Sequence, residues 1–244
     1  MALNPLPLDE AHLFHADTGS VTPALFRAYF EVLSSSELER HARFAVPAPA
    51  LEFLLGRALV RTVLSGYLGL EPRDVALRIG SRGKPELDAP APELDFSLSH
   101  SQGLVACLVA RDCEVGVDVE DIGRSVEASS LATRFFHDAE ARDVCALPEG
   151  ARALRFFQYW TLKEACLKAL GAGLSQPLDR FHFELDADGA PSLVPGPEDP
   201  KGWQVAQLRL EEQFLAAVAI KERRPEPPRR RIVVRRLLPF QSVR

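Results

Sequence analysis

The amino-acid sequence repeats one pattern of elements after a little over a hundred residues, and this repeat constrains the fold more than any other feature. The first segment of each copy has apolar residues at helical spacing and reaches a glycine near its end, the second reads as a strand and a turn, and the third as a buried strand. The matching segments are 51–70 with 154–174, 75–87 with 181–193, and 103–111 with 213–221.

The order helix, strand, turn, strand, strand predicts an α+β fold of two similar halves, each an antiparallel sheet against a long helix. We expect the halves to pack as an intramolecular pseudo-dimer with a ligand cleft between them. Identity between the copies is low, so coincidence is the alternative to duplication. The predicted division is residues 1–112, residues 113–222 and a basic tail, residues 223–244.

Composition indicates a globular protein, because 46% of the 244 residues are hydrophobic. Residues 1–19 lack the basic and apolar regions of a signal peptide, and the longest apolar run, residues 104–110, is too short to span a bilayer. The four cysteines form no CxxC pair, which favours reduced thiols. We therefore expect a cytoplasmic monomer with no membrane partner.

Charge is unevenly distributed. Residues 221–244 hold nine Lys or Arg and two Glu, so the net charge of −5 leaves 20 minus 32, or −12, on residues 1–220. A general nucleic-acid binder carries a basic face on its folded domain, so nucleic acid is not an expected partner.

Two acidic residues, Asp118 and Glu120, end a valine-rich segment that reads as a buried strand. Side chains two apart in a strand lie roughly 6.6 Å from each other on one face, so these carboxylates repel each other unless something offsets their charge. An exposed strand end, where water screens both, is one explanation. A divalent cation such as Mg²⁺, which prefers carboxylate oxygens and substrate phosphates, is the other.

Further polar residues could complete such a site. Glu164 and Lys168 are spaced i, i+4 in a helical segment, a pattern that is usually only a solvated ion pair. The first half has a cationic turn and a Ser–His corner, whose residues are Arg82, Lys84, Ser99 and His100. Alone each is more often structural, but facing carboxylates they would suit a phosphate site.

Three motifs together resemble the signature of the 4′-phosphopantetheinyl transferases, specifically the pseudo-dimeric type that activates surfactin synthetase. They are GVDVE (116–120), RFFHDAE (134–140) and FFQYWTLKEACLKALGAGL (156–174), with support from FLLGRALVR, RGKPEL and FSLSHS. The resemblance extends from about Ser35 to about Ile220.

The resemblance implies transfer of the phosphopantetheine arm of coenzyme A to a serine of an acyl or peptidyl carrier protein, with release of adenosine 3′,5′-bisphosphate. It implies Mg²⁺, or Mn²⁺ in its place, on Asp118, Glu120 and Glu164. The residues that it places on coenzyme A are Arg40, Arg43, Gly83, Lys84, Pro85, Ser99, His100 and Lys168, with Arg82 beside them.

The catalytic base stays open among Glu164, Glu120 and Glu140, the last of which matches an acid of the family's site. One residue departs from the family: where many relatives have an arginine that holds coenzyme A, this chain has Glu52, and Arg57 is a candidate replacement.

Two other functions are alternatives. A non-catalytic coenzyme A or carrier-protein binding module would fit a degraded nucleotide pocket around Glu52, whereas a magnesium-dependent phosphatase would need a nucleophilic Asp early in a parallel sheet. For the tail, a mobile or loosely docked segment is the alternative to a surface that steers an acidic carrier protein through Arg229–Arg231, Arg235 and Arg236.

Overall fold

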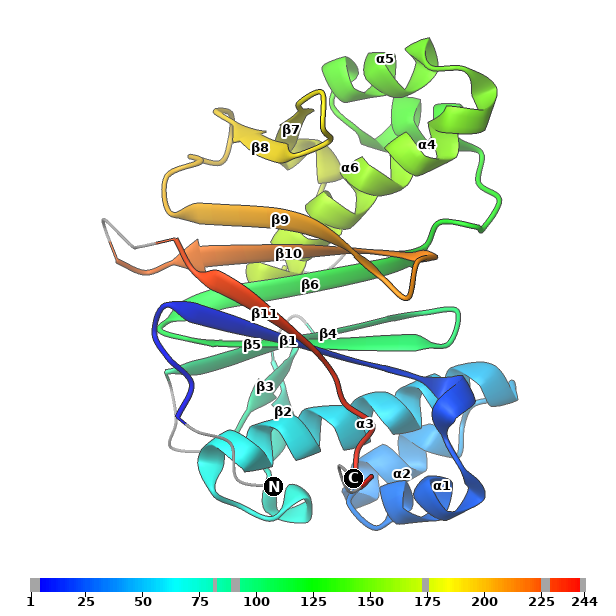
Figure 1. Ribbon diagram of the computed structural model, residues 1–244, viewed down its shortest axis with the longest axis vertical. Helices are drawn as coiled ribbons and strands as arrows, with labels where there is room; N and C mark the ends of the chain where they lie inside the picture. Colours follow the sequence, from blue (N-terminus) through cyan, green and yellow to red (C-terminus); the bar gives the residue numbers. More distant parts are fainter. Residues whose placement is uncertain (1–4, 81–82, 89–92, 173–175, 225–228, 242–244) are drawn as a thin grey trace.

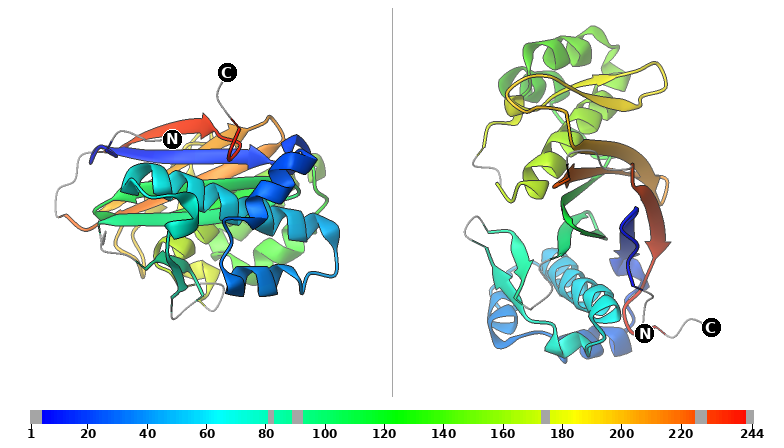
Figure 2. Two further views of the ribbon diagram at one scale, coloured as in Figure 1. Left: turned by 90° about the horizontal axis from the view of Figure 1, so that it is seen from below. Right: turned by 90° about the vertical axis from the view of Figure 1, so that its left-hand side faces the viewer.

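The computed structural model of the protein describes residues 5–80, 83–88, 93–172, 176–224 and 229–241. Two sheets pack face to face, and a long helix covers the outer face of each (Figures 1 and 2). The helices are α3 (Pro47–Leu68) and α6 (Glu149–Ala169). This arrangement confirms the predicted α+β fold of two similar halves.

The N-terminal half contains a four-stranded sheet in the order β11-β1-β5-β4. Its strands are β1 (Glu10–Asp17), β4 (Leu94–Ser101), β5 (Leu104–Arg111) and β11 (Arg231–Arg236). Around α3 lie η1 (Thr18–Ser20), α1 (Pro23–Phe30), α2 (Ser35–His41), η2 (Pro72–Asp74), β2 (Leu77–Ile79) and β3 (Pro85–Leu87). The sheet is antiparallel except for the parallel pairing of β1 with β11.

The C-terminal half contains a three-stranded antiparallel sheet in the order β6-β10-β9. Its strands are β6 (Cys113–Asp121), β9 (Trp203–Leu210) and β10 (Phe214–Glu222). Around α6 lie α4 (Ala128–Phe135), α5 (Asp138–Ala146), η4 (Leu178–Arg180), β7 (His182–Leu185) and β8 (Pro191–Val194). Asp112, with φ 56°, forms the tight connection from β5 to β6, while the exact division of the chain stays a prediction.

Alternation along the strands builds a hydrophobic core between the two sheets. Val115, Val117 and Val119 of β6 point into it, together with Ala106 and Leu108 of β5. The opposite faces of the sheets pack on the helices in two further cores. The inward faces of β5 and β6 therefore form a core that the two halves share, and each half has a second core under its helix.

One glycine fixes how closely α6 approaches its sheet. A methyl group in place of the Gly116 hydrogen would collide with the Ala165 carbonyl of α6. Because only glycine permits this backbone contact, the helix lies directly on the face of β6 that carries Asp118 and Glu120.

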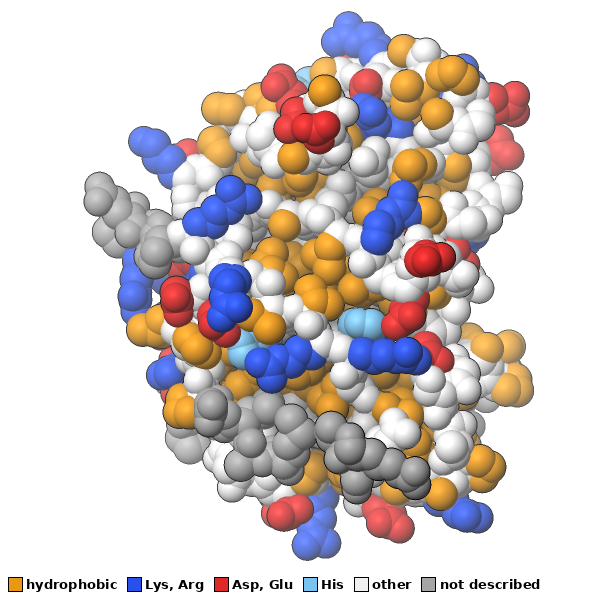
Figure 3. Space-filling view, in the orientation of Figure 1, with side chains coloured by type: hydrophobic (Ala, Val, Ile, Leu, Met, Phe, Trp, Pro, Cys, Tyr) orange, Lys and Arg blue, Asp and Glu red, His pale blue; other side chains and the backbone are white. Residues whose placement is uncertain are grey.

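The C-terminal segment is part of the N-terminal sheet. Just before β11, Arg230 forms an ion pair with Glu222 at the end of β10. β11 itself pairs with β1 (Figures 1 and 2). Further ion pairs join Arg231 to Glu10 and Arg236 to Asp17. Figure 3 shows basic side chains on this face beside acidic ones, so much of the positive charge is locally compensated.

None of the helices in the described ranges combines the length and the hydrophobicity needed to cross a membrane.

Candidate functional site

The site begins on β6, where Asp118 and Glu120 point away from the central core toward α6. Asp118 is buried, with 6% of its surface exposed. Its Oδ1 accepts hydrogen bonds from Lys168 Nζ at 2.7 Å and from Ser99 Oγ at 3.0 Å. The same ammonium group donates to Ser99 Oγ at 2.8 Å. A strand of each half and a helix thus meet at one carboxylate.

Glu164 lies one helical turn before Lys168 and is 8% exposed. Burial, reinforced by the charge of Asp118, raises the pKa of Glu164 to about 7, although Lys168 acts in the opposite direction. Burial and Asp118 also raise the pKa of Glu120, whose Oε2 accepts a hydrogen bond from Ser101 Oγ at 2.9 Å. We call Asp118, Glu120 and Glu164 the carboxylate cluster; its members repel one another in a site that excludes most water.

Two oxygen atoms of the carboxylate cluster are buried without a hydrogen-bond partner among the described residues, Asp118 Oδ2 and Glu164 Oε1. Buried polar atoms are rarely left unpaired unless a ligand or ion uses them. In the described part of the chain, however, no three acidic, imidazole or thiol side chains already enclose a metal position. Asp118 turns to Lys168 instead, and Glu120 turns to Ser101 and to Arg124, 3.3 Å away.

A row of side chains on β4 joins the two halves beside this cluster. At every second position an oxygen accepts a backbone N–H of β6: Asp95 from Val115, Ser97 from Val117, Ser99 from Val119 and Ser101 from Asp121, at 2.8–3.4 Å. We call these four residues the acceptor row. Because it satisfies the free edge of β6, it fixes the register of Asp118 and Glu120 against β4.

Lys84 in the cationic turn of the N-terminal half also contacts both β4 and β6. Lys84 Nζ donates to Asp95 Oδ2 at 2.8 Å and to the Val115 carbonyl at 3.1 Å. Gly83 has φ 88° in the turn, and Pro85 begins β3. Arg82 lies outside the described residues.

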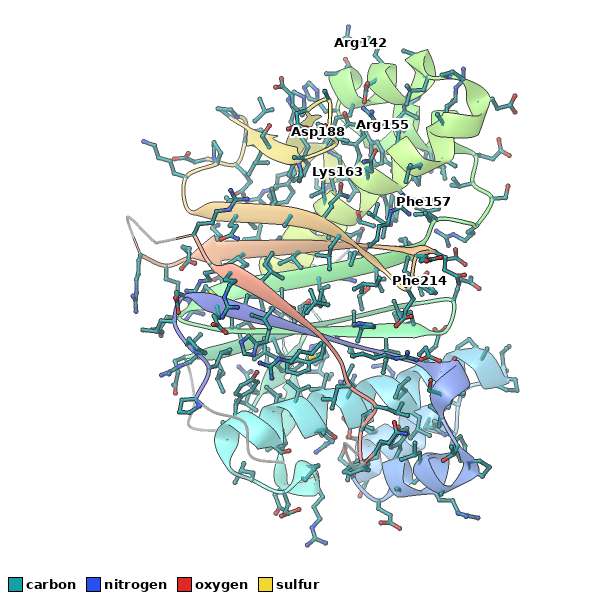
Figure 4. The ribbon with its side chains drawn as sticks, in the orientation of Figure 1. Arg142, Arg155, Phe157, Lys163, Asp188 and Phe214 are labelled. Atoms are coloured by element: carbon teal, nitrogen blue, oxygen red, sulfur yellow. The ribbon has the colours of Figure 1, made fainter. Side chains whose placement is uncertain are left out.

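Glu140 does not join the carboxylate cluster. It forms a fully buried ion pair with Lys163 of α6, which is labelled in Figure 4; the two groups are 2.7 Å apart and both side chains are 0% exposed. We call these two residues the buried pair. Both Glu140 oxygens also accept backbone N–H groups, from Phe183 at 2.8 Å and His137 at 3.0 Å. The contacts that the structure shows for Glu140 therefore hold α5, α6 and β7 together, away from the carboxylate cluster.

The basic residues of the first half also lie apart from the cluster. Arg40 stacks over the Phe53 ring with its side chain exposed, and Arg43 pairs with Glu39 at 3.9 Å between exposed side chains. Arg57 is 6% exposed and pairs with Glu37 at 3.6 Å, so it is not available to a ligand.

Comparisons with known proteins cover both halves. Residues 114–219 match the family model described as 4′-phosphopantetheinyl transferase superfamily, and residues 20–113 match 4′-phosphopantetheinyl transferase, N-terminal. The 4′-phosphopantetheinyl transferase HetI of Nostoc sp. is 36% identical over 87% of this chain and 88% of its own length. The chain belongs to the 4′-phosphopantetheinyl transferase superfamily.

Other relatives agree with this membership. The transferase Sfp of Bacillus subtilis is 32% identical over 68% of this chain and 72% of its own. The solved holo-[acyl-carrier-protein] synthase of Thermotoga maritima aligns with 46% of this chain and 64% of its own at 27% identity, with a TM-score of 0.37. The sequence matches carry the assignment: this protein is an enzyme, a phosphopantetheinyl transferase of the pseudo-dimeric Sfp-like type.

Sequence reasoning missed most of the residues that hold the transferase site together. Asp95, Ser97 and Ser101 of the acceptor row were not singled out, although their period of two in DFSLSHS is a visible signal. Arg124, which pairs with Glu120 and stacks over the Phe157 ring, had no signal of this kind.

Proposed function

We propose that this transferase moves the 4′-phosphopantetheine group of coenzyme A to a serine hydroxyl of an acyl or peptidyl carrier protein in a magnesium-dependent reaction that releases adenosine 3′,5′-bisphosphate. The observation that carries the proposal is the carboxylate cluster of a chain of this family: two of its buried oxygens lack a hydrogen-bond partner in the described part of the chain, and Lys168 lies alongside.

Asp118, Glu120 and Glu164 would hold the metal ion. Their oxygens are the hard ligands that Mg²⁺ prefers. Burial and the charge of Asp118 raise the pKa of Glu164 and Glu120, and a divalent charge would favour their ionised forms. When bound, the ion would neutralise charge on the pyrophosphate as its bond breaks. Mn²⁺ has similar ligand chemistry and is the alternative ion for this site.

Lys168 and Ser99 would contact the phosphate oxygens directly, beside the metal ion. Lys168 has 28% of its side chain exposed, so its ammonium group can reach a ligand while remaining next to Asp118. An ammonium in this position stabilises negative charge as the phosphorus–oxygen bond to the leaving group lengthens. Ser99, held by Val119 and Asp118, would add a hydroxyl group.

The base is one of two residues of the carboxylate cluster. In the proposed reaction the carrier serine Oγ forms a bond to phosphorus, adenosine 3′,5′-bisphosphate departs with the bridging oxygen, and the hydroxyl proton passes to a carboxylate. Glu164 and Glu120 both have raised pKa values, which suits proton acceptance near neutral pH. Glu140 is not part of this proposal.

The nucleotide-binding residues are proposals as well. Gly83, Lys84 and Pro85 would line the nucleotide side of the site, with His100 at the end of β4 and Arg82 nearby. Arg40 and Arg43 have exposed side chains in and just after α2 and could approach the phosphate groups only from the solvent side.

An acidic carrier protein is the proposed macromolecular partner. Arg230, just before β11, is paired with Glu222, and Arg231 and Arg236 on β11 are paired with Glu10 and Asp17. Among the described residues of this segment, the charge available to an acidic partner therefore falls on the exposed Arg229 and Arg235. We also propose that the transferase acts as a monomer in the cytoplasm, where its four free cysteines would stay reduced.

The test is to incubate the protein with coenzyme A, Mg²⁺ and an unmodified carrier protein and to measure the intact mass of the carrier. The proposal predicts a mass gain of one phosphopantetheine group, one equivalent of adenosine 3′,5′-bisphosphate, and no reaction in the presence of EDTA. Tight binding of coenzyme A with an unchanged carrier would favour a binding module, and release of inorganic phosphate without transfer would favour a phosphatase.

A further inference from the structure

Glu52 makes contacts that neither the composition nor the motifs of the chain indicate. It lies in the N-terminal part of α3, and its carboxylate accepts hydrogen bonds from His100 Nδ1 at 2.9 Å and from the Gly103 backbone N–H at 2.6 Å. Only 12% of the Glu52 side chain is exposed. A helix of the N-terminal half therefore holds the tip of the β4–β5 hairpin.

The hairpin tip needs such an anchor because it is tightly bent. Gln102 and Gly103 have φ values of 47° and 93°, a conformation that glycine adopts readily and glutamine does not. The residues just before the bend belong to the transferase site, since Ser99 contacts Asp118 and Ser101 contacts Glu120. A shift of the hairpin would therefore move the site.

The contact also fixes the protonation of the His100 ring at one nitrogen. The hydrogen bond from His100 and that from Gly103 hold the pKa of Glu52 below its ordinary value, so the carboxylate is ionised and can only accept hydrogen bonds. Nδ1 must then carry the hydrogen. Nε2 has no partner among the described residues, and half of the imidazole side chain is exposed.

We propose that Glu52 is a positioning residue for coenzyme A: it holds the His100 ring through Nδ1 and leaves Nε2 to contact a phosphate group of the nucleotide. This inference rests on the proposed function. His100 and Ser99 point to opposite faces of β4, since they are neighbours in a strand, so a ligand with phosphates at two positions could meet both.

The sign of one mutational effect tests this role against simple electrostatics. Glu52 carries a negative charge, so without a positioning role Glu52→Ala would strengthen the binding of an anionic nucleotide. We expect the opposite: the KM for coenzyme A rises roughly tenfold, as for a lost charge-assisted hydrogen bond, while kcat changes by less than about twofold. Glu52→Gln keeps an oxygen acceptor, so we expect a smaller rise in the KM for coenzyme A.

Three further measurements complete the test. Calorimetry with adenosine 3′,5′-bisphosphate should show the same loss of affinity without a carrier protein, and Glu71→Gln, an exposed carboxylate beyond α3, should show none. Nitrogen NMR should show a protonated Nδ1 on His100 in the wild type and lose this signature in Glu52→Ala. Glu52→Ala and His100→Ala should be non-additive in KM.

An unchanged or lower KM in Glu52→Ala, or additivity with His100→Ala, would overturn the positioning role even if the wild type transfers phosphopantetheine normally. A wild type that neither binds the bisphosphate nor modifies a carrier would instead overturn the proposed function and, with it, this inference.

Discussion

Two groups of charged side chains that each include one residue of α6 differ in how their polar atoms are satisfied. The buried pair, Glu140 and Lys163, is fully enclosed, and Lys163 Nζ also donates to the carbonyls of Leu178 and Phe181. Glu164, the next residue after Lys163, belongs to the carboxylate cluster. In this cluster one oxygen of Glu164 and one of Asp118 have no hydrogen-bond partner among the described residues.

Whether the polar atoms of a buried charged group all have partners indicates whether the group stabilises the fold or can bind a ligand. A buried ion pair whose polar atoms are all satisfied holds α5, α6 and β7 together, and removing one member leaves an uncompensated charge. Carboxylates that remain close together with unpaired oxygens cost stability, and a fold keeps such groups where a ligand or ion uses them. We therefore propose a structural role for Lys163 and a functional role for its neighbour Glu164.

The largest effect is expected from Asp118→Ala. Transfer should fall by at least about a thousandfold, because the substitution removes a proposed metal ligand and the partner of Lys168. Initial rates of carrier modification measure this, and unfolding in urea checks that the fold is retained. A variant with native-like unfolding and near wild-type turnover would refute the functional side of the comparison.

Next in size is the loss of the buried pair. Lys163→Met should destabilise the protein by about 3 kcal/mol or more, since it removes the cation that pairs with Glu140 inside the fold. Equilibrium urea unfolding measures the change. Lys168→Met, whose side chain is partly exposed, is the matched variant: it should lower turnover and cost much less stability. Equal destabilisation by the two would remove the distinction between the two groups.

Glu164 should make the stability of the metal-free protein depend on pH. Its pKa is about 7 in the fold against 4.5 in the unfolded chain, so the native state holds the proton longer and the contribution of Glu164 is lost as pH rises from 4.5 through 7. After allowance for partial exposure, the loss is roughly 1 to 2 kcal/mol. Glu164→Gln should flatten this part of the pH profile; an unchanged slope would place the titration elsewhere.

The smallest effects are expected at and just before β11, where a buried, paired arginine precedes an exposed one. Arg230 is buried against Glu222, whereas Arg235 is exposed. Arg235→Ala should raise the KM for an acidic carrier protein about twofold at low salt and leave it unchanged at high salt. Arg230→Met should instead lower the unfolding midpoint. A salt-independent effect of Arg235→Ala would argue against steering.

The helices and strands whose hydrophobic residues recur at regular spacing could be predicted from the sequence. The helices around residues 51–70 and 154–174 and the strands around 103–111 and 213–221 correspond to α3, α6, β5 and β10, because hydrophobic spacing reports burial directly. β11 was not recognised as a strand, since its pairing with β1 joins opposite ends of the chain and its many arginines resemble a solvated tail.

Which residues meet at the site was harder to predict. The proximity of Asp118 and Lys168 follows from motif and register, but the commitment of Glu140 to Lys163 depends on which side of α6 each residue occupies. Glu52 was noticed only as a departure from its family, and its contact with the hairpin tip depends on a turn whose geometry the sequence does not specify.

The central claim, that the carboxylate cluster binds a divalent ion, is tested most directly by calorimetric titration of Mg²⁺ into the wild type, Asp118→Ala and a control. Asp188→Ala, which removes an exposed carboxylate between β7 and β8 (Figure 4), is the control. The account predicts one magnesium ion per chain in the wild type and the control, and at least about tenfold weaker binding in Asp118→Ala. Equal affinity in all three proteins, or no binding to the wild type, would contradict it.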